Sequence, residues 1–251
     1  LHNALNPTAY HRWAVEWPPM ATAILTAAER TGAALVTVSN LYAYGRTGAP
    51  MREDTPLRPY EEKGRIRARM WTDALAAHTA GRVRALEVRA SDYLGAGAES
   101  SATRAMAAAV AGRRAQVLGR ADVPHSWTYT GDVAALAVAA AADDTAYGRA
   151  WHVPTHPPRT QRELLTEIAD LAGAPAPRIT ETPDALLRLV GLVDRPVGAA
   201  AKVSYQFSHP FVIDDTAARS RFGLHPTPWK DVLVETVTDL TARSATHGGA
   251  R

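Results

Sequence analysis

The stretch that decides the fold runs from Leu35 to Arg69 and reads LVTVSNLYAYGRTGAPMREDTPLRPYEEKGRIRAR. Its first four residues are apolar or β-branched, which is typical of a buried strand. They follow a helical pattern over residues 21–30 and a Thr31-Gly32 stop. A strand that follows a helix in this way is expected in a parallel sheet built from crossover connections.

Polar and cationic residues gather in the same stretch. Ser39 and Asn40 stand at the carboxyl end of the predicted strand, which is the edge where open α/β sheets bind ligands. Lys63 and Arg67 are one helical turn apart, so both side chains project from one face of the following helix, which we expect to face that edge. If the protein has a reactive centre, we expect it here.

The composition excludes several classes of protein. The 251 residues are 46% hydrophobic, so the chain can bury the core of one large domain or of a core with a smaller lobe. The pI near 9.3 comes from a net charge of only +3, and we expect neither a nucleic-acid nor a membrane partner. The absence of cysteine excludes disulfides and a Cys nucleophile, and it is compatible with the cytoplasmic location that we expect. The longest apolar run, Val133 to Ala142, is too short to cross a bilayer.

Several motifs resemble those of one enzyme family. Tyr44-Gly45 and the Glu53-Asp54-Thr55-Pro56-Leu57-x-Pro59 segment follow the strand in the order of the extended short-chain dehydrogenase/reductases, the NAD-dependent epimerase/dehydratase group. Three later segments, residues 89–95, 125–134 and 213–228, resemble further parts of this family, so the likeness covers nearly the whole chain.

The resemblance implies an α/β fold with a Rossmann-like, doubly wound parallel sheet and a smaller α+β substrate lobe. The N-terminal strands of the family, with their Gly-rich loop, are expected to be absent from this chain. We expect the Rossmann-like core at residues 1–97 and 125–155, the substrate lobe at 98–124 and 156–243, and a flexible tail at 244–251.

The catalytic positions of the family are substituted. Aligning Tyr44-Gly45 with the family's Tyr-Gly places Asn40 where the catalytic Ser or Thr stands, with Ser39 one residue earlier. In the same alignment Lys63 replaces the catalytic Tyr, and Arg67 replaces the Lys of Tyr-x-x-x-Lys. Lys63 would serve as the proton-transfer group if Arg67 and desolvation lowered its pKa, whereas the default interpretation of this charge run is a solvated basic helix.

The family also implies a dinucleotide, NAD or NADP. The positions of this sequence that match its cofactor-binding segments are Asn3, Ala4, Val38, Arg67, Ala90 and Ser91. The only G-x-G, Gly95-Ala96-Gly97, lacks the third Gly and the helix start of the phosphate-binding fingerprint, so we interpret it as a turn.

Other positions are expected to meet the substrate. The segment Arg89 to Gly95 resembles one that lines the nicotinamide side of the family's site, with Asp92 in the place of an Asn. We expect Asp92 near Lys63 and Arg67, as a catalytic acid/base partner or as a structural ion pair. His125 replaces an Arg that often meets a substrate phosphate in the family. We assign substrate binding to Tyr42, Tyr93 and His125.

Several residues of types that often serve function are not assigned to the site. Trp13 and Trp17 are expected to pack rather than to cap a ligand pocket, and Asp132 is expected to cap the helix that begins at Val133. His152 and His156 have the spacing of a helical metal pair, but the prolines around them prevent a helix, so no metal site is expected.

Three hypotheses remain open from the sequence. The first is an NAD(P)-dependent oxidoreductase or epimerase acting on a small molecule of sugar-like or secondary-metabolite type. The second is a cofactor-independent lyase or isomerase that uses Lys63, and the third is a non-catalytic ligand-binding homologue. In this family two helices of each subunit often form a four-helix dimer interface. The resemblance therefore also predicts a homodimer through residues 18–31 and 63–79.

Overall fold

The computed structural model describes residues 1–248 of the chain as alternating strands and helices. The strands are β1 (His2–Asn3), β2 (Leu35–Asn40), β3 (Ala85–Ala90), β4 (Asp92–Leu94), β5 (Ala115–Leu118), β6 (Trp127–Tyr129), β7 (Ala150–His152) and β8 (Ile179–Thr182). The α-helices are α1 (Trp13–Thr31), α2 (Glu62–Thr79), α3 (Thr103–Val110), α4 (Thr130–Ala141), α5 (Gln161–Leu171), α6 (Asp184–Val190), α7 (Arg195–Val203), α8 (Thr216–Phe222) and α9 (Trp229–Gly248). Short 3-10 helices are η1 (Tyr10–Arg12), η2 (Tyr42–Tyr44), η3 (Asp144–Ala146) and η4 (Ser204–Phe207).

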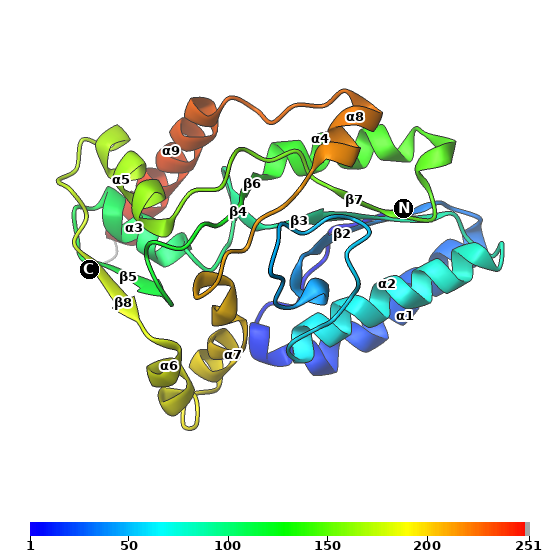
Figure 1. The fold of residues 1–251 in the computed structure, drawn as a ribbon, viewed down its shortest axis with the longest axis horizontal. Helices are drawn as coiled ribbons and strands as arrows, with labels where there is room; N and C mark the ends of the chain where they lie inside the picture. The colour runs from blue at the N-terminus through cyan, green and yellow to red at the C-terminus, as the bar shows by residue number, and fades with distance from the viewer. Residues whose placement is uncertain (249–251) are drawn as a thin grey trace.

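The main sheet is parallel throughout and has the order β1-β2-β3-β7. Asn40 pairs with Ala90 at the carboxyl ends of β2 and β3. Helices cover both faces, with α1 and α2 below the sheet and α4 with α8 above it (Figure 1). The predicted α/β fold with a Rossmann-like parallel sheet is therefore confirmed.

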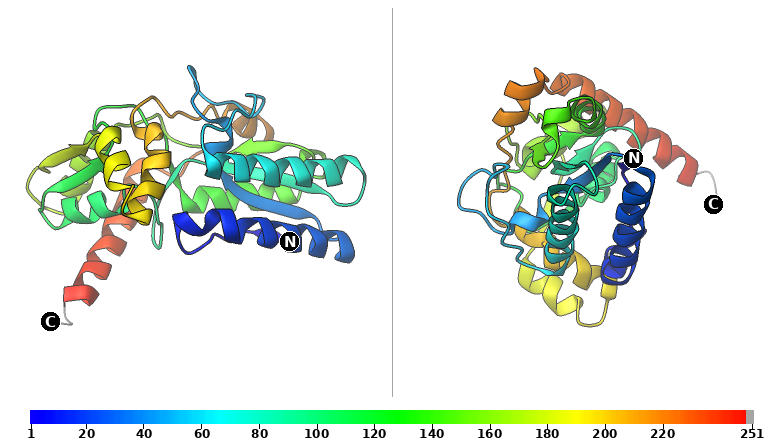
Figure 2. Two further views of the ribbon diagram at one scale, coloured as in Figure 1. Left: turned by 90° about the horizontal axis from the view of Figure 1, so that it is seen from below. Right: turned by 90° about the vertical axis from the view of Figure 1, so that its right-hand side faces the viewer.

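Successive side chains of a strand point to opposite faces of the sheet, so each strand contributes to the helix layers on both sides. Leu86 and Val88 of β3 belong to the apolar cluster with α4 and α8, whereas Ala85 belongs to the cluster with α1 and α2. Glu87 and Arg89 share the face of Ala85, so two charged side chains lie between the sheet and the α1–α2 layer. Figure 2 shows α1 and α2 side by side along the sheet.

A smaller lobe continues from the end of β3. It holds two parallel strand pairs, β4 with β6 and β5 with β8. Its core draws on α3, α5 and α9, with Leu94, Met106, Leu165 and Leu233 among its buried residues. Helix α9 extends to Gly248, so residues 244–248 of the expected tail are helical, and residues 249–251 lie outside the described part of the chain.

Helix α1 has two prolines inside it, and the expectation that Asp132 caps α4 is wrong. Helix α1 begins at Trp13 and contains Pro18 and Pro19 in its interior. It tolerates them because Ala14 and Val15, whose carbonyls lose their helical partners, are exposed to water. Asp132 does not cap α4, because that helix begins at Thr130 and places Asp132 inside its first turn. Its carboxylate instead accepts hydrogen bonds from the backbone N–H and the hydroxyl of Thr227.

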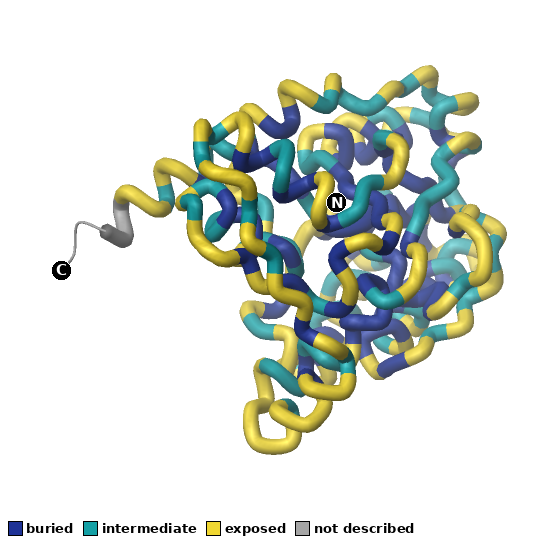
Figure 3. The backbone as a smooth tube through the Cα atoms, turned by 60° about the vertical axis from the view of Figure 1, so that its left-hand side comes forward, coloured by how far each residue is buried: buried dark blue, intermediate teal, exposed yellow. Residues whose placement is uncertain are grey.

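Helices α6 and α7 form a hairpin. The hairpin projects from the lower edge of the molecule, with its loop exposed (Figure 3). Its two helices cross at Gly191 and Gly198, where a Cβ on Gly191 would lie 2.5 Å from the Gly198 Cα. Only glycine allows so close a backbone approach.

Candidate active site

A cavity of about 560 Å³ opens at the carboxyl ends of β1, β2 and β3. We call it the strand-end cavity. Ligands bind at this position in open α/β sheets, because the strand ends and the loops after them leave a crevice there. The predicted site residues that line it are Ala4, Val38, Asn40, Tyr42, Arg67, Ala90, Ser91, Asp92 and Tyr93.

Arg67 reaches this cavity from α2 and is only 5% exposed. The centre of its guanidinium lies 4.9 Å from the ring of Trp13 and 4.5 Å from the ring of Trp17. Its Nη2 donates a long hydrogen bond of 3.5 Å to Asn6 Oδ1, and its Nε and Nη1 have no partner. Burial lowers the pKa of Arg67, and the charge of the nearby Glu87 only partly opposes the shift.

A pair of phenols lies beside Arg67. The hydroxyls of Tyr10 and Tyr42 are 3.1 Å apart. Burial raises the pKa of Tyr42 well above its usual value, so this phenol keeps its proton at neutral pH. Burial also raises the pKa of Tyr93, while the charge of Arg67 opposes the shift. The cavity wall therefore offers protonated phenols, which donate hydrogen bonds.

Asn40 supports this arrangement through the backbone. Its Oδ1 accepts a hydrogen bond of 3.2 Å from the N–H of Tyr42, which fixes the start of η2. Ser39 lies on the opposite face of the strand, outside the cavity, and its buried hydroxyl has no partner. Asn3 lines a different hollow, a groove of about 890 Å³ between α1 and α2, and its Oδ1 accepts from the N–H of Leu5.

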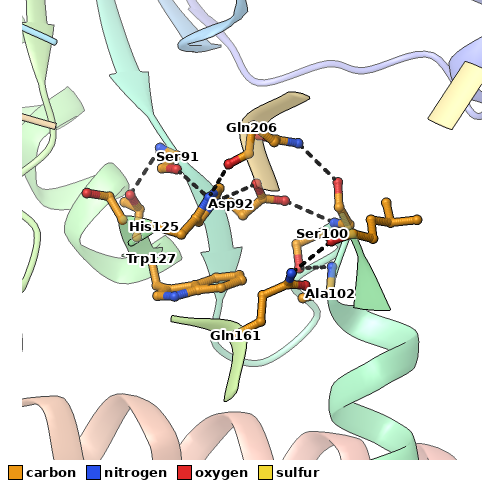
Figure 4. A network of polar contacts seen from close by, with 12 residues as sticks. Ser91, Asp92, Ser100, Ala102, His125, Trp127, Gln161 and Gln206 are labelled. Atoms are coloured by element: carbon orange, nitrogen blue, oxygen red, sulfur yellow. Dashed lines mark hydrogen bonds and ion pairs between the residues drawn. The ribbon is translucent and has the colours of Figure 1, made fainter. Parts of the chain in front are cut away.

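Asp92 and His125 form a buried pair behind the cavity wall (Figure 4). Asp92 Oδ2 lies 3.0 Å from His125 Nε2, and the other ring nitrogen faces the backbone oxygen of Gln206 at 3.3 Å. Because both nitrogens face acceptors, one proton lies between Asp92 and His125. The imidazole is stacked between Phe207 and Phe211. Two positions that depart from the family pattern are therefore in contact, and only Asp92 reaches the cavity.

Lys63 lies beside the cavity, with its Nζ 5.3 Å from the centre of the Tyr10 ring. It is 2% exposed, and its Nζ donates a hydrogen bond of 2.9 Å to the backbone oxygen of Ala199 in α7. Burial lowers the pKa of Lys63, and the nearby Glu61 opposes the shift. Arg67 is not among the groups that shift it, and Lys63 does not line the strand-end cavity. The interpretation of a solvated basic helix is wrong for Lys63 and Arg67, although Arg65 and Arg69 are exposed.

The turn Gly95-Ala96-Gly97 is not a phosphate cradle. The N–H of Gly95 donates to Thr236 Oγ1, and the N–H of Ala96 donates to Glu235 Oε1. Helix α9 thus occupies the donors that a phosphate would need, and the interpretation as a turn is confirmed.

Tyr10 is a residue of the site that the sequence interpretation missed. It lies in η1, 32 positions before Tyr42, and no local pattern connects the two. The nearest signal is the aromatic spacing with Trp13, on whose ring Tyr10 stacks at 5.3 Å. Trp13 and Trp17 pack in an apolar cluster, as expected, and they also flank Arg67.

The comparison with known families identifies the family of the chain. The model of the NAD dependent epimerase/dehydratase family matches residues 18–153, more than half of the chain. The chain belongs to this family. A search of curated proteins found no match.

Solved structures share the fold at low identity. RMD from Pseudomonas aeruginosa, complexed with NADPH, is 17% identical, with a TM-score of 0.74 over 96% of this chain and 81% of that one. The double mutant of DesIV, a dTDP-glucose 4,6-dehydratase from Streptomyces venezuelae with NAD and DAU bound, is 17% identical, with a TM-score of 0.73 over 98% of this chain and 74% of that one. UDP-glucuronic acid 4-epimerase from Bacillus cereus, in complex with NAD, is 13% identical, with a TM-score of 0.73 over 95% and 72%. These identities support the fold alone.

Residues 1–248 contain neither a candidate membrane span nor a candidate metal cluster. No helix within residues 1–248 is long and apolar enough to cross a membrane. No cluster of three His, Asp or Glu side chains in that range has the geometry to hold a metal ion.

Proposed function

We propose that the strand-end cavity is the active site of an NAD(P)-dependent oxidoreductase or epimerase-type enzyme that acts on a small molecule. The observation that carries this proposal is the placement of Tyr42 and Arg67 together in one cavity, at the strand ends of a chain of this family. A phenol and a cation in contact with one ligand are what proton transfer to a carbonyl oxygen requires.

Each residue has a definite role in this proposal. Tyr42, hydrogen-bonded to Tyr10, would donate its proton toward the substrate oxygen, since burial keeps this phenol protonated at neutral pH. The charge of Arg67 stabilises the negative charge that develops on that oxygen. Asn40 holds η2, and with it Tyr42, in position. These roles replace the expected assignment of proton transfer to Lys63.

The residues of this chain fit one end of the dinucleotide. Ala4, Val38, Ala90, Ser91 and Arg67 lie at the strand ends and would hold the nicotinamide side, whereas Asn3 faces the α1–α2 groove. When bound, the nicotinamide would supply or accept a hydride. The pyrophosphate does not fit the residues present, because the sequence has no G-x-x-G-x-x-G loop and its one G-x-G turn is occupied by α9.

The first test is a fluorescence titration of the chain with NADH and NADPH, followed by a screen of carbonyl substrates for oxidation of the bound cofactor. We expect one cofactor to bind through its nicotinamide end, and turnover to fall by about 100-fold or more in Tyr42→Phe, the range of general acid catalysis. Tyr60→Phe is the matched control, since Tyr60 is 47% exposed and lies outside the cavity. Absence of binding to either cofactor would contradict the proposal.

A second candidate is cofactor-independent proton transfer by Lys63, which its lowered pKa favours. This alternative predicts turnover without nicotinamide that is lost in Lys63→Met and kept in Lys202→Met, whose lysine is exposed. A non-catalytic ligand-binding role predicts binding without turnover in every variant. The homodimer through α1 and α2 and the cytoplasmic location remain predictions, the first of which light scattering tests.

A further inference from the structure

We infer that the ligand of the strand-end cavity carries a negative charge, as a carboxylate or a phosphate, that pairs with Arg67. The inference rests on the proposed function for the location of the site, but not for its chemistry. It names the class of ligand that the cavity accepts.

The first reason is that Arg67 is buried without an opposite charge. It is 5% exposed, and no carboxylate within residues 1–248 forms an ion pair with it. Glu87 is near enough for its charge to act on Arg67, but its carboxylate is paired with Arg89 at 2.6 Å. Burying a charge is unfavourable unless it is paired and hydrogen-bonded. Two of its nitrogens have no acceptor, and the third has only a 3.5 Å contact with the neutral Asn6.

The indole rings do not supply the missing partner. Trp13 and Trp17 attract the guanidinium through their ring faces. A ring face carries no net charge, so it leaves the charge of Arg67 uncompensated. What the two rings do is hold the guanidinium in one place at the cavity wall, which prepares it for a ligand.

The carboxylates around the cavity already have other partners. Asp92 pairs with His125 at 3.0 Å, and Glu99 pairs with Arg243 at 2.9 Å. A second arginine, Arg104, also lines the cavity and is exposed. The cavity lining thus carries two arginines and two carboxylates, but neither carboxylate pairs with Arg67, and an anionic ligand would supply the partner that Arg67 lacks.

Carboxylate and phosphate share the chemistry that Arg67 recognises, and probes separate the two sources. We would titrate the full chain with succinate, with its neutral analogue succinamide, with inorganic phosphate and with NADPH, by calorimetry and by tryptophan fluorescence. Fluorescence reports on the site directly because Trp13 and Trp17 flank Arg67. A response to succinate alone indicates a substrate carboxylate, and a response to phosphate and NADPH indicates a phosphate group.

We expect at least one anionic probe to bind and succinamide to bind at least about tenfold more weakly, as expected for loss of a charged partner. Arg67→Met should lower the affinity for the anionic probe by a similar factor. Arg69 is an exposed arginine of the same helix, so Arg69→Met should leave this affinity unchanged. Equal binding of succinate and succinamide with no response to phosphate, or no binding of any anion, would overturn the inference. The comparison of charged and neutral probes needs no variant, so it tests whether the cavity prefers an anion even if Arg67→Met does not fold.

The outcomes also separate this inference from the proposed function. Anion binding that depends on Arg67, without any turnover of nicotinamide, supports the inference and contradicts the proposed function. Turnover of nicotinamide on neutral substrates, with no preference for anions, contradicts the inference alone.

Discussion

Two buried arginines on neighbouring elements, Arg67 on α2 and Arg89 on β3, have opposite surroundings. Arg89 is 1% exposed, and its Nε donates to Glu87 at 2.6 Å while its Nη1 donates to the hydroxyl of Tyr44 at 2.6 Å. Arg67 has two indole rings, one long contact and a cavity. A buried charge with partners from its own chain supports the fold, whereas a buried charge without them indicates a site for something else.

The surroundings of Arg89 continue as a chain of hydrogen bonds. The hydroxyl of Tyr44 lies 2.7 Å from His152 Nε2, and His152 Nδ1 lies 2.9 Å from the backbone oxygen of Asp214. Because a carbonyl only accepts, Nδ1 carries the proton and Nε2 accepts from Tyr44, so His152 is neutral. The network joins β3, η2, β7 and the segment before α8.

The largest effect is expected when this network loses its carboxylate. In Glu87→Ala, Arg89 becomes a second buried arginine without a counter-charge, and the free energy of unfolding should fall by about 3–5 kcal/mol. Urea unfolding followed by circular dichroism measures it. A loss below about 1 kcal/mol would show that Arg89 does not depend on Glu87, and the comparison with Arg67 would lose its basis.

The next effect is a dependence of stability on pH. Burial lowers the pKa of His152 to about 4, while the unfolded chain titrates near the ordinary value of about 6.5. Between these values the unfolded state binds more protons, so stability falls as pH falls, by at most about 3 kcal/mol from this one group. His152→Gln should reduce the difference in unfolding free energy between pH 7 and pH 4, and an unchanged difference would contradict the assignment.

A smaller effect is expected at Arg67. Arg67→Met removes a buried charge that has no partner, so the free energy of unfolding should stay within about 1 kcal/mol or rise. Arg89→Met is the matched comparison, because it leaves Glu87 buried and alone and should destabilise by several times more. Equal losses in the two variants would remove the distinction between a structural and a ligand-binding arginine.

The smallest effect is expected on the exposed side of the same helix. Arg69 pairs with Asp73 at 2.8 Å, one turn along α2, with both side chains largely in water. Arg69→Ala should change the free energy of unfolding by no more than about 0.5 kcal/mol. A larger loss would mean that charge on α2 matters regardless of burial.

Much of the fold could be predicted from the sequence because its signals are local. The apolar run at residues 35–38, the helical spacing after Lys63 and the strand before Asp92 each lie within a few residues of the element that they specify. The place of Arg67 at the strand ends followed from the same logic, since a helix after a parallel strand begins at that edge.

The remainder depends on contacts between distant residues. Lys63 and Arg67 share a helix face, yet Lys63 is held by a carbonyl 136 residues away and Arg67 by two indoles. Nothing near Asp92 indicates that its partner is His125, 33 residues later. The contact of α6 with α7 is likewise not local, because it depends on the close approach of the Gly191 and Gly198 backbones.

The smaller lobe has a consequence for how the chain is made. Its core combines α3, α5 and α9, so it cannot close before residues 229–240 have been synthesised. The main sheet is complete at His152, long before that point. We therefore expect the sheet to form before the smaller lobe, while the apolar faces of α3 and α5 stay uncovered until α9 has been synthesised. A nascent chain that ends before Trp229 would therefore expose the apolar faces of α3 and α5. Exposed apolar surface of this kind is what chaperones bind.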